Sequence, residues 1–578
     1  MKAKNPNRHK LRTGLVTGGF MIWLLLIGVR AGYLQLYRGT WLSQKAAGQY
    51  EKEQIVLGKR GSIYDAHHEA MAVSIETTSL AANPTMIEHR GKAAAALARA
   101  LHLKPRDVKR KLSGARSFVW LKRQATPKEV AAVKKLGFKG VDFLPEHTRF
   151  YPNTTLAGQV LGFTGIDGHG LEGLEFYYDN ELKGVAQTVT VLKDALGRGF
   201  DMDHQVGSDQ AGNNLVLTID RHIQYITEQA LADAVTAHQA HSGMAIVMDP
   251  KTGAILALAN YPLFNPNNFR RYDRAVWRDR AITDPFEPGS TMKIFNAAAA
   301  LESGNSTPST IFYCENGSYL IGSHTVNDTK PHGWLSLQQI VKYSSNIGAV
   351  KVAQHTGSRV FYEALRGFGF GDRTHVDCPG ESAGSLANYK RWTAMDNAAI
   401  AFGQGVSVTA LQLITAAAAI ANDGLLMQPH IVQAITDANG RLVRTVEPTA
   451  LRQVISAENA LTIRRIMRTV ITSGGTGVEA ELEGYSVAGK TGTAQKIDKN
   501  GTYAQNRYIA SFVGFAPSEQ PVLAVLVVVN EPQDTYYGGP VAAPAFRQIV
   551  KETFGYLNVA PAIDMRKLRV SRDYKVSG

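Results

Sequence analysis

The chain opens with a segment that belongs in a membrane or in a hydrophobic core. Residues 13–29 are uncharged and mostly apolar, and as a helix they would span about 26 Å, close to the roughly 30 Å hydrocarbon core of a bilayer. After Arg30 the apolar run resumes and continues to Tyr37, where aromatic residues suit a membrane interface. The sequence therefore predicts one membrane anchor over residues 13–37.

The charges before this segment predict its orientation. Five basic residues and no acidic residue precede it: Lys2, Lys4, Arg8, Lys10 and Arg12. Such tails stay in the cytoplasm, so we expect residues 1–12 there and the rest of the chain beyond the inner membrane, in the periplasm. A cleaved signal peptide shares the basic start and the apolar centre. No small-x-small cleavage motif follows Val29, which favours a retained anchor.

Composition limits what the rest of the chain can be. With 578 residues and 44% hydrophobic residues, the chain is long and apolar enough for several folded domains. The formal net charge of +14 suits an anionic partner, and a location outside the cytoplasm excludes nucleic acid. Two cysteines, Cys314 and Cys378, are too few for a disulfide framework or a Cys-rich zinc module, and their spacing leaves open whether they pair.

Residues 38–210 mix short strand-like and helical segments, and we interpret them as a separate domain next to the membrane. Within it, residues 104–139 hold twelve Lys and Arg against two acids. We predict a solvated helical face here, with contact to an anionic surface as the alternative. Three histidines lack metal-ligand spacing and are predicted to be surface loop residues: His67, His68 and His169.

Residues 211–557 have the pattern of an α+β domain. Five apolar segments are predicted as strands: 214–220, 244–248, 254–259, 508–515 and 522–529. Helices are predicted over 221–238 and over 544–557, the second with Pro544 in its first turn. We expect one antiparallel sheet assembled from both ends of the domain, flanked by helices and joined to an all-helical subdomain. Residues 558–578 have no core pattern and are predicted to be a loose basic tail.

The first chemical motif is Ser290-Thr-Met-Lys293, at the start of a strongly helical run that ends at Gly304. Residues three apart lie on one face of a helix, one turn from each other. A serine hydroxyl needs an adjacent base, and a lysine whose pKa is lowered by burial can be that base. Alone, the pattern is weak, because a capping serine followed by a surface lysine gives the same letters.

The second motif is Ser344-Ser345-Asn346, between two predicted helices. Ser336 and Gln339 form a capping box for the first helix, which we expect to end near Tyr343. A hydroxyl and an amide at such a junction can face a cleft, although polar loop residues are the commoner interpretation.

The third motif is Lys490-Thr491-Gly492-Thr493, in a strand-like segment. A glycine in a strand often marks the close approach of a ligand or of another backbone. A lysine and two hydroxyls beside such a strand would receive a carboxylate.

Together and in this order, the three motifs resemble the active site of the penicillin-recognising serine enzymes. Further segments resemble class B penicillin-binding proteins: RGSIYD at 60–65, RFYP at 149–152, GLEGLE at 170–175, DPKTG at 249–253, FEPGS at 286–290 and YYGGPVAAP at 536–544. Within that class, SSNIGA at 344–349 and the YYGG segment look most like the cell-division transpeptidase that cross-links septal peptidoglycan. One departure is AHHE at 66–69, where the family usually has an Arg and a Gly after the Asp.

The resemblance implies a transmembrane helix, an elongated α/β pedestal of the dimerisation type and a C-terminal transpeptidase domain. It implies catalytic roles for five residues: Ser290 as nucleophile, Lys293 as base, Ser344 and Lys490 as the proton route to the leaving amine, and Asn346 as an orienting amide. It implies substrate binding by Thr491, Gly492, Thr493 and, more weakly, Tyr536 and Tyr537. No metal or organic cofactor is expected. The implied partners are D-Ala-D-Ala stem peptides, β-lactams, a membrane glycan polymerase and division-complex proteins.

Several alternatives share these motifs. A carboxypeptidase or β-lactamase would not need residues 38–210, and no deacylating glutamate is identifiable. A β-lactam sensor needs a cytoplasmic output device, which residues 1–12 do not supply. A glycosyltransferase domain is not expected, since no acidic catalytic pattern for one occurs before residue 210. An elongation-type transpeptidase would be chemically almost identical and stays open.

Overall fold

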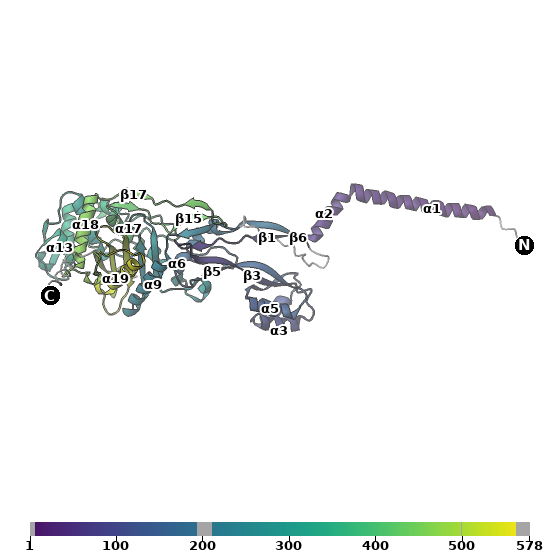
Figure 1. The fold of residues 1–578 in the computed structure, drawn as a ribbon, viewed down its shortest axis with the longest axis horizontal. Helices are drawn as coiled ribbons and strands as arrows, with labels where there is room; N and C mark the ends of the chain where they lie inside the picture. The colour runs from purple at the N-terminus through teal and green to yellow at the C-terminus, as the bar shows by residue number, and fades with distance from the viewer. Residues whose placement is uncertain (1–5, 193–210, 499, 562–578) are drawn as a thin grey trace, which may run out of the picture. The chain divides into compact units, whose positions relative to one another are not determined.

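The structure, a computed structural model, describes residues 6–192, 211–498 and 500–561. The chain divides into two compact units: residues 1–58 with 184–210, and residues 59–183 with 211–578 (Figure 1). Most of the predicted basic tail, residues 562–578, lies outside the described residues.

The first unit carries the apolar N-terminal segment. Helix α1 runs over Pro6–Gly32 and continues into a π-helical turn over Tyr33–Tyr37. The helical stretch Lys10–Tyr37 is long and apolar enough to cross a membrane, and large apolar side chains such as Leu25 are exposed along it. This is consistent with a single-pass anchor, since lipid would cover that surface. The unit also contains α2 (Gly39–Tyr50) and the antiparallel pair β1 (Glu51–Leu57) and β6 (Ala186–Leu192).

The second unit contains a pedestal sheet with the strand order β16-β15-β7-β2-β3-β4, in which β5 also pairs with β3. Its strands are β2 (Ile63–Tyr64), β3 (Ala70–Ala82), β4 (Val119–Ala125), β5 (Val141–Phe150), β7 (Asn214–Leu217), β15 (Val432–Thr436) and β16 (Leu442–Thr445). The sequence predicts that this segment belongs to the same antiparallel sheet as residues 244–248 and 508–515, and this is wrong: β7 runs parallel to β2 and antiparallel to β15. The apolar pattern identified the strand, but pairing with β2 depends on contacts between residues 152 positions apart, such as Ile63 and Leu215.

A lobe at the C-terminal end of β3 and the N-terminal end of β5 has its own hydrophobic core. It contains α3 (Arg90–Ala100), α4 (Pro105–Leu112), β4 and α5 (Pro127–Leu136). The basic stretch 104–139 is therefore helix, strand and helix, and not one helical face. Proline in the first turn starts both α4 and α5, and the Thr126 capping box and left-handed Gly137 bound the second.

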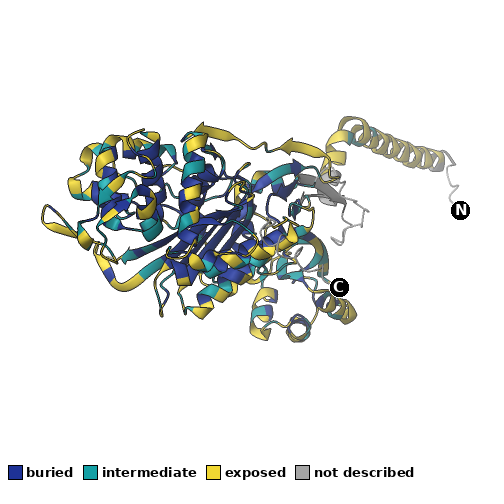
Figure 2. Ribbon diagram, turned by 60° about the vertical axis from the view of Figure 1, so that its left-hand side comes forward, coloured by how far each residue is buried: buried dark blue, intermediate teal, exposed yellow. Residues whose placement is uncertain are grey.

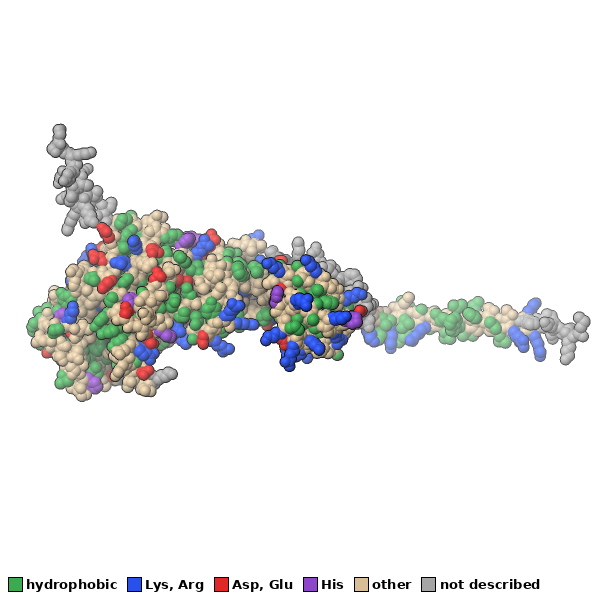
Figure 3. Space-filling view, turned by 90° about the horizontal axis from the view of Figure 1, so that it is seen from below, with side chains coloured by type: hydrophobic (Ala, Val, Ile, Leu, Met, Phe, Trp, Pro, Cys, Tyr) green, Lys and Arg blue, Asp and Glu red, His purple; other side chains and the backbone are tan. Residues whose placement is uncertain are grey.

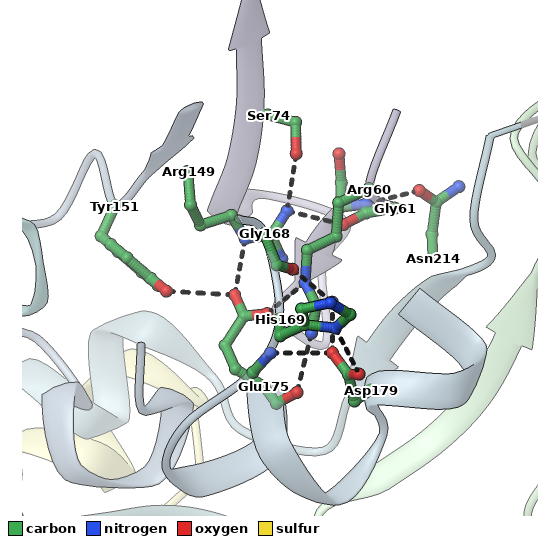
Figure 4. Close-up of polar contacts among 12 residues, drawn as sticks. Arg60, Gly61, Ser74, Arg149, Tyr151, Gly168, His169, Glu175, Asp179 and Asn214 are labelled. Atoms are coloured by element: carbon green, nitrogen blue, oxygen red, sulfur yellow. Dashed lines mark hydrogen bonds and ion pairs between the residues drawn. The ribbon is translucent and has the colours of Figure 1, made fainter. Parts of the chain in front are cut away.

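The pedestal motifs that lie far apart in the sequence meet in one buried ion cluster (Figure 4). Glu175 accepts from Arg60 Nε at 2.7 Å and from Arg149 Nε at 2.5 Å, and Tyr151 Oη donates to it at 3.2 Å. Arg60 also pairs with Asp179 at 2.6 Å. The cluster thus ties β5 to the short helices α7 (Gly173–Tyr177) and α8 (Asp179–Leu182) and to the backbone that leads into β2.

The three singled-out histidines lie at turns and make no metal-type cluster among the described residues. His67 Nε2 lies 2.9 Å from Asp220 Oδ2, and His169 Nδ1 lies 3.6 Å from Asp179 Oδ2. His68 has φ +61°, a left-handed conformation that glycine adopts more readily than histidine.

The catalytic sheet has five antiparallel strands in the order β18-β19-β20-β8-β9. They are β18 (Ala488–Ile497), β19 (Tyr503–Ala516), β20 (Leu523–Asn530), β8 (Ser242–Met248) and β9 (Ile255–Tyr261). Alternate residues of β8 face two cores: Ala245 packs with α9 (Arg221–Ala237) and α19 (Gly538–Tyr556), whereas Ile246 packs with the helical side. Figure 2 shows these strands as a buried layer. The predicted sheet from both ends of the domain is confirmed, apart from β7.

Helix α19 begins earlier than predicted, at Gly538, so Pro544 lies inside it and not in its first turn. A Cβ at Gly538 would lie 2.3 Å from Ser511 O and 2.5 Å from Gly492 O. The glycines of the YYGG segment therefore let the helix start against the sheet, a contact that helix propensity alone would not indicate.

The helical side of the domain contains α12 (Met292–Glu302), α13 (Leu337–Tyr343), α14 (Asn346–Thr356), α15 (Ser358–Gly367), α16 (Ala394–Ala401), α17 (Ala410–Ala421) and α18 (Ala457–Ile471). It also carries three two-stranded ribbons: β10 (Ile311–Tyr313) with β13 (Trp334–Ser336), β11 (Ser318–Ile321) with β12 (His324–Asn327), and β14 (Leu425–Met427) with β17 (Ala450–Gln453). Cys314 and Cys378 are both free and buried.

Candidate active site

Ser290 lies in a 3-10 turn, Gly289–Thr291, that leads into α12. Gly289 has φ +55°, and a Cβ there would lie 2.5 Å from Thr493 O, so glycine is needed at this position. Its N–H donates to Gly403 O at 3.0 Å. The missing side chain lets the turn lie directly against strand β18, and Ser290 starts the helical run as predicted.

The amine of Lys293 reaches back along α12 to the serine. Its Nζ lies 2.9 Å from Ser290 Oγ, 2.7 Å from Ser344 O and 2.7 Å from Asn346 Oδ1. The side chain is 1% exposed, and burial lowers the pKa of Lys293 to about 7, although the negative charge of Asp328 opposes the shift.

The hydrogen-bond partners of Lys293 are compatible with a neutral amine that acts as a base. The carbonyl oxygens of Ser344 and Asn346 can only accept, so they use two N–H groups of the amine. A neutral amine then has one lone pair left, and this lone pair can accept the hydroxyl proton of Ser290. The contact has the length that proton transfer from the hydroxyl to the amine would need.

Ser344 lies between the two lysines of the site. It ends α13 in a left-handed conformation, φ +61° and ψ 39°, which costs about 1–3 kcal/mol for a residue other than glycine. Its Oγ lies 3.1 Å from Lys293 Nζ and 3.0 Å from Lys490 Nζ. The strained conformation places a hydroxyl where a proton can pass between the two amines.

Asp328 is a site residue that the sequence did not reveal. It follows β12, and its carboxylate accepts from Ser345 Oγ at 2.6 Å, from Ile347 N at 3.0 Å and from Asn346 N. These bonds fix the start of α14 and thereby position Asn346, whose side-chain oxygen accepts from Lys293. A lone aspartate in a loop, 18 residues before the asparagine it orients, gives no sequence signal.

Lys490 projects from β18 into the same cluster and is fully buried. Besides Ser344, it donates to Thr491 O at 3.0 Å and to Thr491 Oγ1 at 3.2 Å. Burial and the neighbouring charge of Lys293 lower the pKa of Lys490 well below its usual value. A Cβ on Gly492 would lie 3.0 Å from Pro288 O, so the predicted close approach at this glycine is confirmed.

The remaining predicted residues lie along the edge formed by β18. Thr491 Oγ1 is 2.9 Å from Thr476 Oγ1, and Thr493 Oγ1 accepts from Gly538 N at 3.2 Å. Tyr536 stacks on Tyr508 at 4.2 Å, and Tyr537 packs on Tyr536 at 4.5 Å. Both tyrosines are partly exposed just before α19, and their part in substrate binding stays a prediction.

A serine hydroxyl bonded to a buried amine can transfer an acyl group through a serine ester, and the fold and site together define a class of enzymes in which a serine lies beside a buried lysine. Comparison with known proteins identifies the family within that class. The sequence model described as the penicillin binding protein transpeptidase domain matches residues 243–551, and the penicillin-binding protein dimerisation domain matches residues 55–217. The chain belongs to the class B penicillin-binding proteins and is a peptidoglycan D,D-transpeptidase.

Relatives align along almost the whole chain. The probable peptidoglycan D,D-transpeptidase PenA of Neisseria gonorrhoeae is 34% identical over 567 residues, covering 97% of this chain and 95% of PenA. The peptidoglycan D,D-transpeptidase FtsI of Escherichia coli K12 is 33% identical over 580 residues, covering 97% of this chain and 95% of FtsI. Stage V sporulation protein D of Bacillus subtilis is 33% identical over 584 residues, covering 100% of this chain and 89% of the sporulation protein. Because one relative is named for sporulation, family membership does not assign this chain to cell division.

Solved structures agree with the fold. Penicillin-binding protein 3 of Mycobacterium tuberculosis, in complex with aztreonam, has a TM-score of 0.69 and 29% sequence identity, and the match covers 88% of this chain and 98% of that one. A second structure of that protein holds ampicillin.

Proposed function

We propose that this chain cross-links stem peptides through an acyl-enzyme on Ser290. Ser290 Oγ attacks the carbonyl between the two terminal D-alanines as Lys293 takes its proton. The bond to the last D-alanine breaks, and its amine leaves with a proton delivered through Ser344. An amine of a neighbouring stem peptide then attacks the ester. The amide bond of the cross-link forms as the ester bond breaks, and the proton that the acceptor amine gives up restores the Ser290 hydroxyl.

The contact of 2.9 Å between Lys293 Nζ and Ser290 Oγ carries this proposal. It joins the nucleophile to an amine whose pKa is about 7, so a large share of the amine is neutral near physiological pH. Lys490, bonded to the same Ser344 hydroxyl, supplies the other end of the proton route.

Substrate binding is assigned to the β18 edge. Thr491 and Thr493 would hold the terminal carboxylate of the donor beside the Lys490 amine, and Gly492 would let the peptide backbone approach. The backbone N–H groups of Ser290 and Thr493 would form the oxyanion hole, where loss of one donor costs about 3–4 kcal/mol. Tyr536 and Tyr537 would wall the cleft. The mechanism requires no metal or organic cofactor.

The same nucleophile should react with β-lactams, as the aztreonam and ampicillin complexes of the mycobacterial relative suggest. Intact-protein mass spectrometry after treatment with benzylpenicillin should show one adduct, mapped by peptide analysis to Ser290. Ser290→Ala should abolish it, whereas the exposed Ser309→Ala should not. An unmodified wild-type chain, or an adduct on another residue, would refute the proposal.

We further propose the septal role, with the N-terminus cytoplasmic, the catalytic domain periplasmic and a membrane glycan polymerase among the partners. The SSNIGA and YYGG segments and the relationship to FtsI support this assignment. Depletion of the protein should give filamentous cells. Round cells would indicate the elongation-type transpeptidase instead.

A further inference from the structure

One lobe of the second unit has a large excess of positive charge. Residues 83–143, which we call the basic lobe, hold fifteen Lys and Arg against four Asp and Glu, a surplus of eleven in a chain with a formal charge of +14. Figure 3 shows these cations spread over a rounded surface with few acids between them. The transpeptidase reaction makes no use of them.

The cations of the basic lobe are mostly in contact with solvent. Thirteen are exposed: Arg90, Lys92, Arg99, Lys104, Arg106, Lys109, Arg110, Lys111, Arg116, Lys128, Lys134, Lys135 and Lys139. Within residues 83–143, all of which are described, only Glu88 and Asp142 are exposed acids. The helices turn apolar residues such as Val108 and Val133 inward, so the charged faces point away from the lobe core.

Few of these charges are neutralised by acidic partners. Among the exposed cations, Arg110 forms an ion pair with Asp107 at 3.0 Å. The other ion pairs of the lobe within the described residues are those of Lys122 and Arg123, which are not among the exposed cations. A dense set of unpaired like charges raises the local potential and attracts a polyanionic surface.

An exposed loop over residues 115–118, which we call the aromatic loop, lies among these cations. Phe118 is 42% exposed and packs edge-on against Trp120, with ring centroids 5.1 Å apart. Arg116 precedes it on the exposed loop, and the Arg123 guanidinium lies 5.3 Å from the Trp120 ring. Lys and Arg mixed with exposed aromatic rings are typical of surfaces that insert at a lipid headgroup boundary, whereas a soluble polyanion needs the cations alone.

We propose that the basic lobe binds the anionic phospholipid surface of the membrane that holds the chain. Helix α1 is apolar enough to span that membrane, and a tether of this kind keeps the lobe at a high effective concentration near the lipid. Each Lys or Arg near an anionic leaflet then adds to the attraction, and Phe118 adds an apolar contact. The inference rests on the membrane anchor and not on the transpeptidase reaction.

The test uses the full chain in vesicles of phosphatidylcholine, with or without phosphatidylglycerol. Ser117→Cys in the aromatic loop is labelled with an impermeant fluorescent maleimide, which avoids the two native cysteines because both are buried. Quenching by a spin-labelled lipid then reports contact of the loop with the bilayer. We expect stronger quenching in the anionic vesicles, and its loss at high salt because ions screen the attraction.

A charge-reversed variant, Lys109→Glu with Arg110→Glu and Lys111→Glu, should weaken the quenching in anionic vesicles about tenfold or more. A matched control reverses three exposed cations outside the lobe, Arg465→Glu with Arg547→Glu and Lys551→Glu, and should leave it unchanged. Thermal unfolding of each variant checks its fold. Equal quenching in both vesicle types, no quenching in either, or insensitivity to both salt and charge reversal would overturn the proposal.

Discussion

Lys293 and Lys490 share a hydrogen-bond partner, since Ser344 Oγ lies 3.1 Å from the first amine and 3.0 Å from the second. Burial lowers the pKa of both lysines, and the charge of Lys293 lowers the pKa of Lys490 further. Two ammonium groups on one hydroxyl repel each other, so the pair favours a state with at least one neutral amine. The amine that this coupling keeps neutral is that of Lys490, because the charge of Lys293 is what lowers its pKa.

Acylation of Ser290 should become faster as the pH rises through about 7. Burial lowers the pKa of Lys293 to about 7, and only its neutral form can accept the serine proton, so protonation at lower pH removes the base. The acylation rate constant, measured with a fluorescent penicillin on both sides of this pH, should rise and then level off. Lys293→Arg keeps a cation that cannot act as a base, and should lower the plateau rate about 10²–10⁴-fold. A flat pH profile in the wild type would contradict the role of Lys293.

Asp328→Asn should move this profile to lower pH. The carboxylate raises the pKa of Lys293 by its charge, so the isosteric amide should let the lysine lose its proton more easily. The amide oxygen can still accept from the N–H groups that start α14, so the plateau rate should change much less than the midpoint. Glu315→Gln, which removes the partner of Lys351 at the surface, is the matched control and should leave the midpoint in place. A shift of the midpoint to higher pH for Asp328→Asn would contradict the inference that the charge of Asp328 raises the pKa of Lys293.

Gly492→Ala should abolish acylation and lower stability by about 1–3 kcal/mol, since the site has no room for a methyl group. The new Cβ would lie 2.2 Å from Ser511 Oγ and 3.0 Å from Pro288 O. Adding Ser511→Ala removes the first contact but not the second, which presses on the turn that holds Ser290. The double variant should therefore regain stability in urea unfolding without regaining acylation. If the double variant regained both stability and acylation, the contact with Pro288 O would not be what blocks acylation.

The sequence predicted the parts of this site that depend on local chemistry. The Ser336 capping box starts α13 at Leu337, the Ser344 junction follows it, and Gly492 marks a close backbone approach. Each of these signals is encoded within a few residues, so it can be recognised without knowledge of the fold.

What the sequence missed depends on contacts between distant segments. Asp328 acts on a helix start 18 positions later, β7 pairs with a strand of the pedestal, and α19 starts early because Gly538 packs on Ser511. Propensity and periodicity describe a segment by itself and do not name its neighbours. The resemblance to a known family supplied the catalytic constellation, which no single motif would have established.

Glu175 should contribute more to stability than Arg60, one of the two arginines that it binds. Its two oxygens accept from Arg60 at 2.7 Å and from Arg149 at 2.5 Å, and the glutamate is fully buried. Glu175→Gln would leave two buried guanidinium groups with Asp179 as the remaining acid of the cluster, which should cost about 3–5 kcal/mol. Arg60→Met leaves Glu175 paired with Arg149 and frees a partly exposed Asp179 for water, so it should cost less. The free energies of urea unfolding of the two variants give the comparison, and equal losses would show that the cluster does not centre on the glutamate.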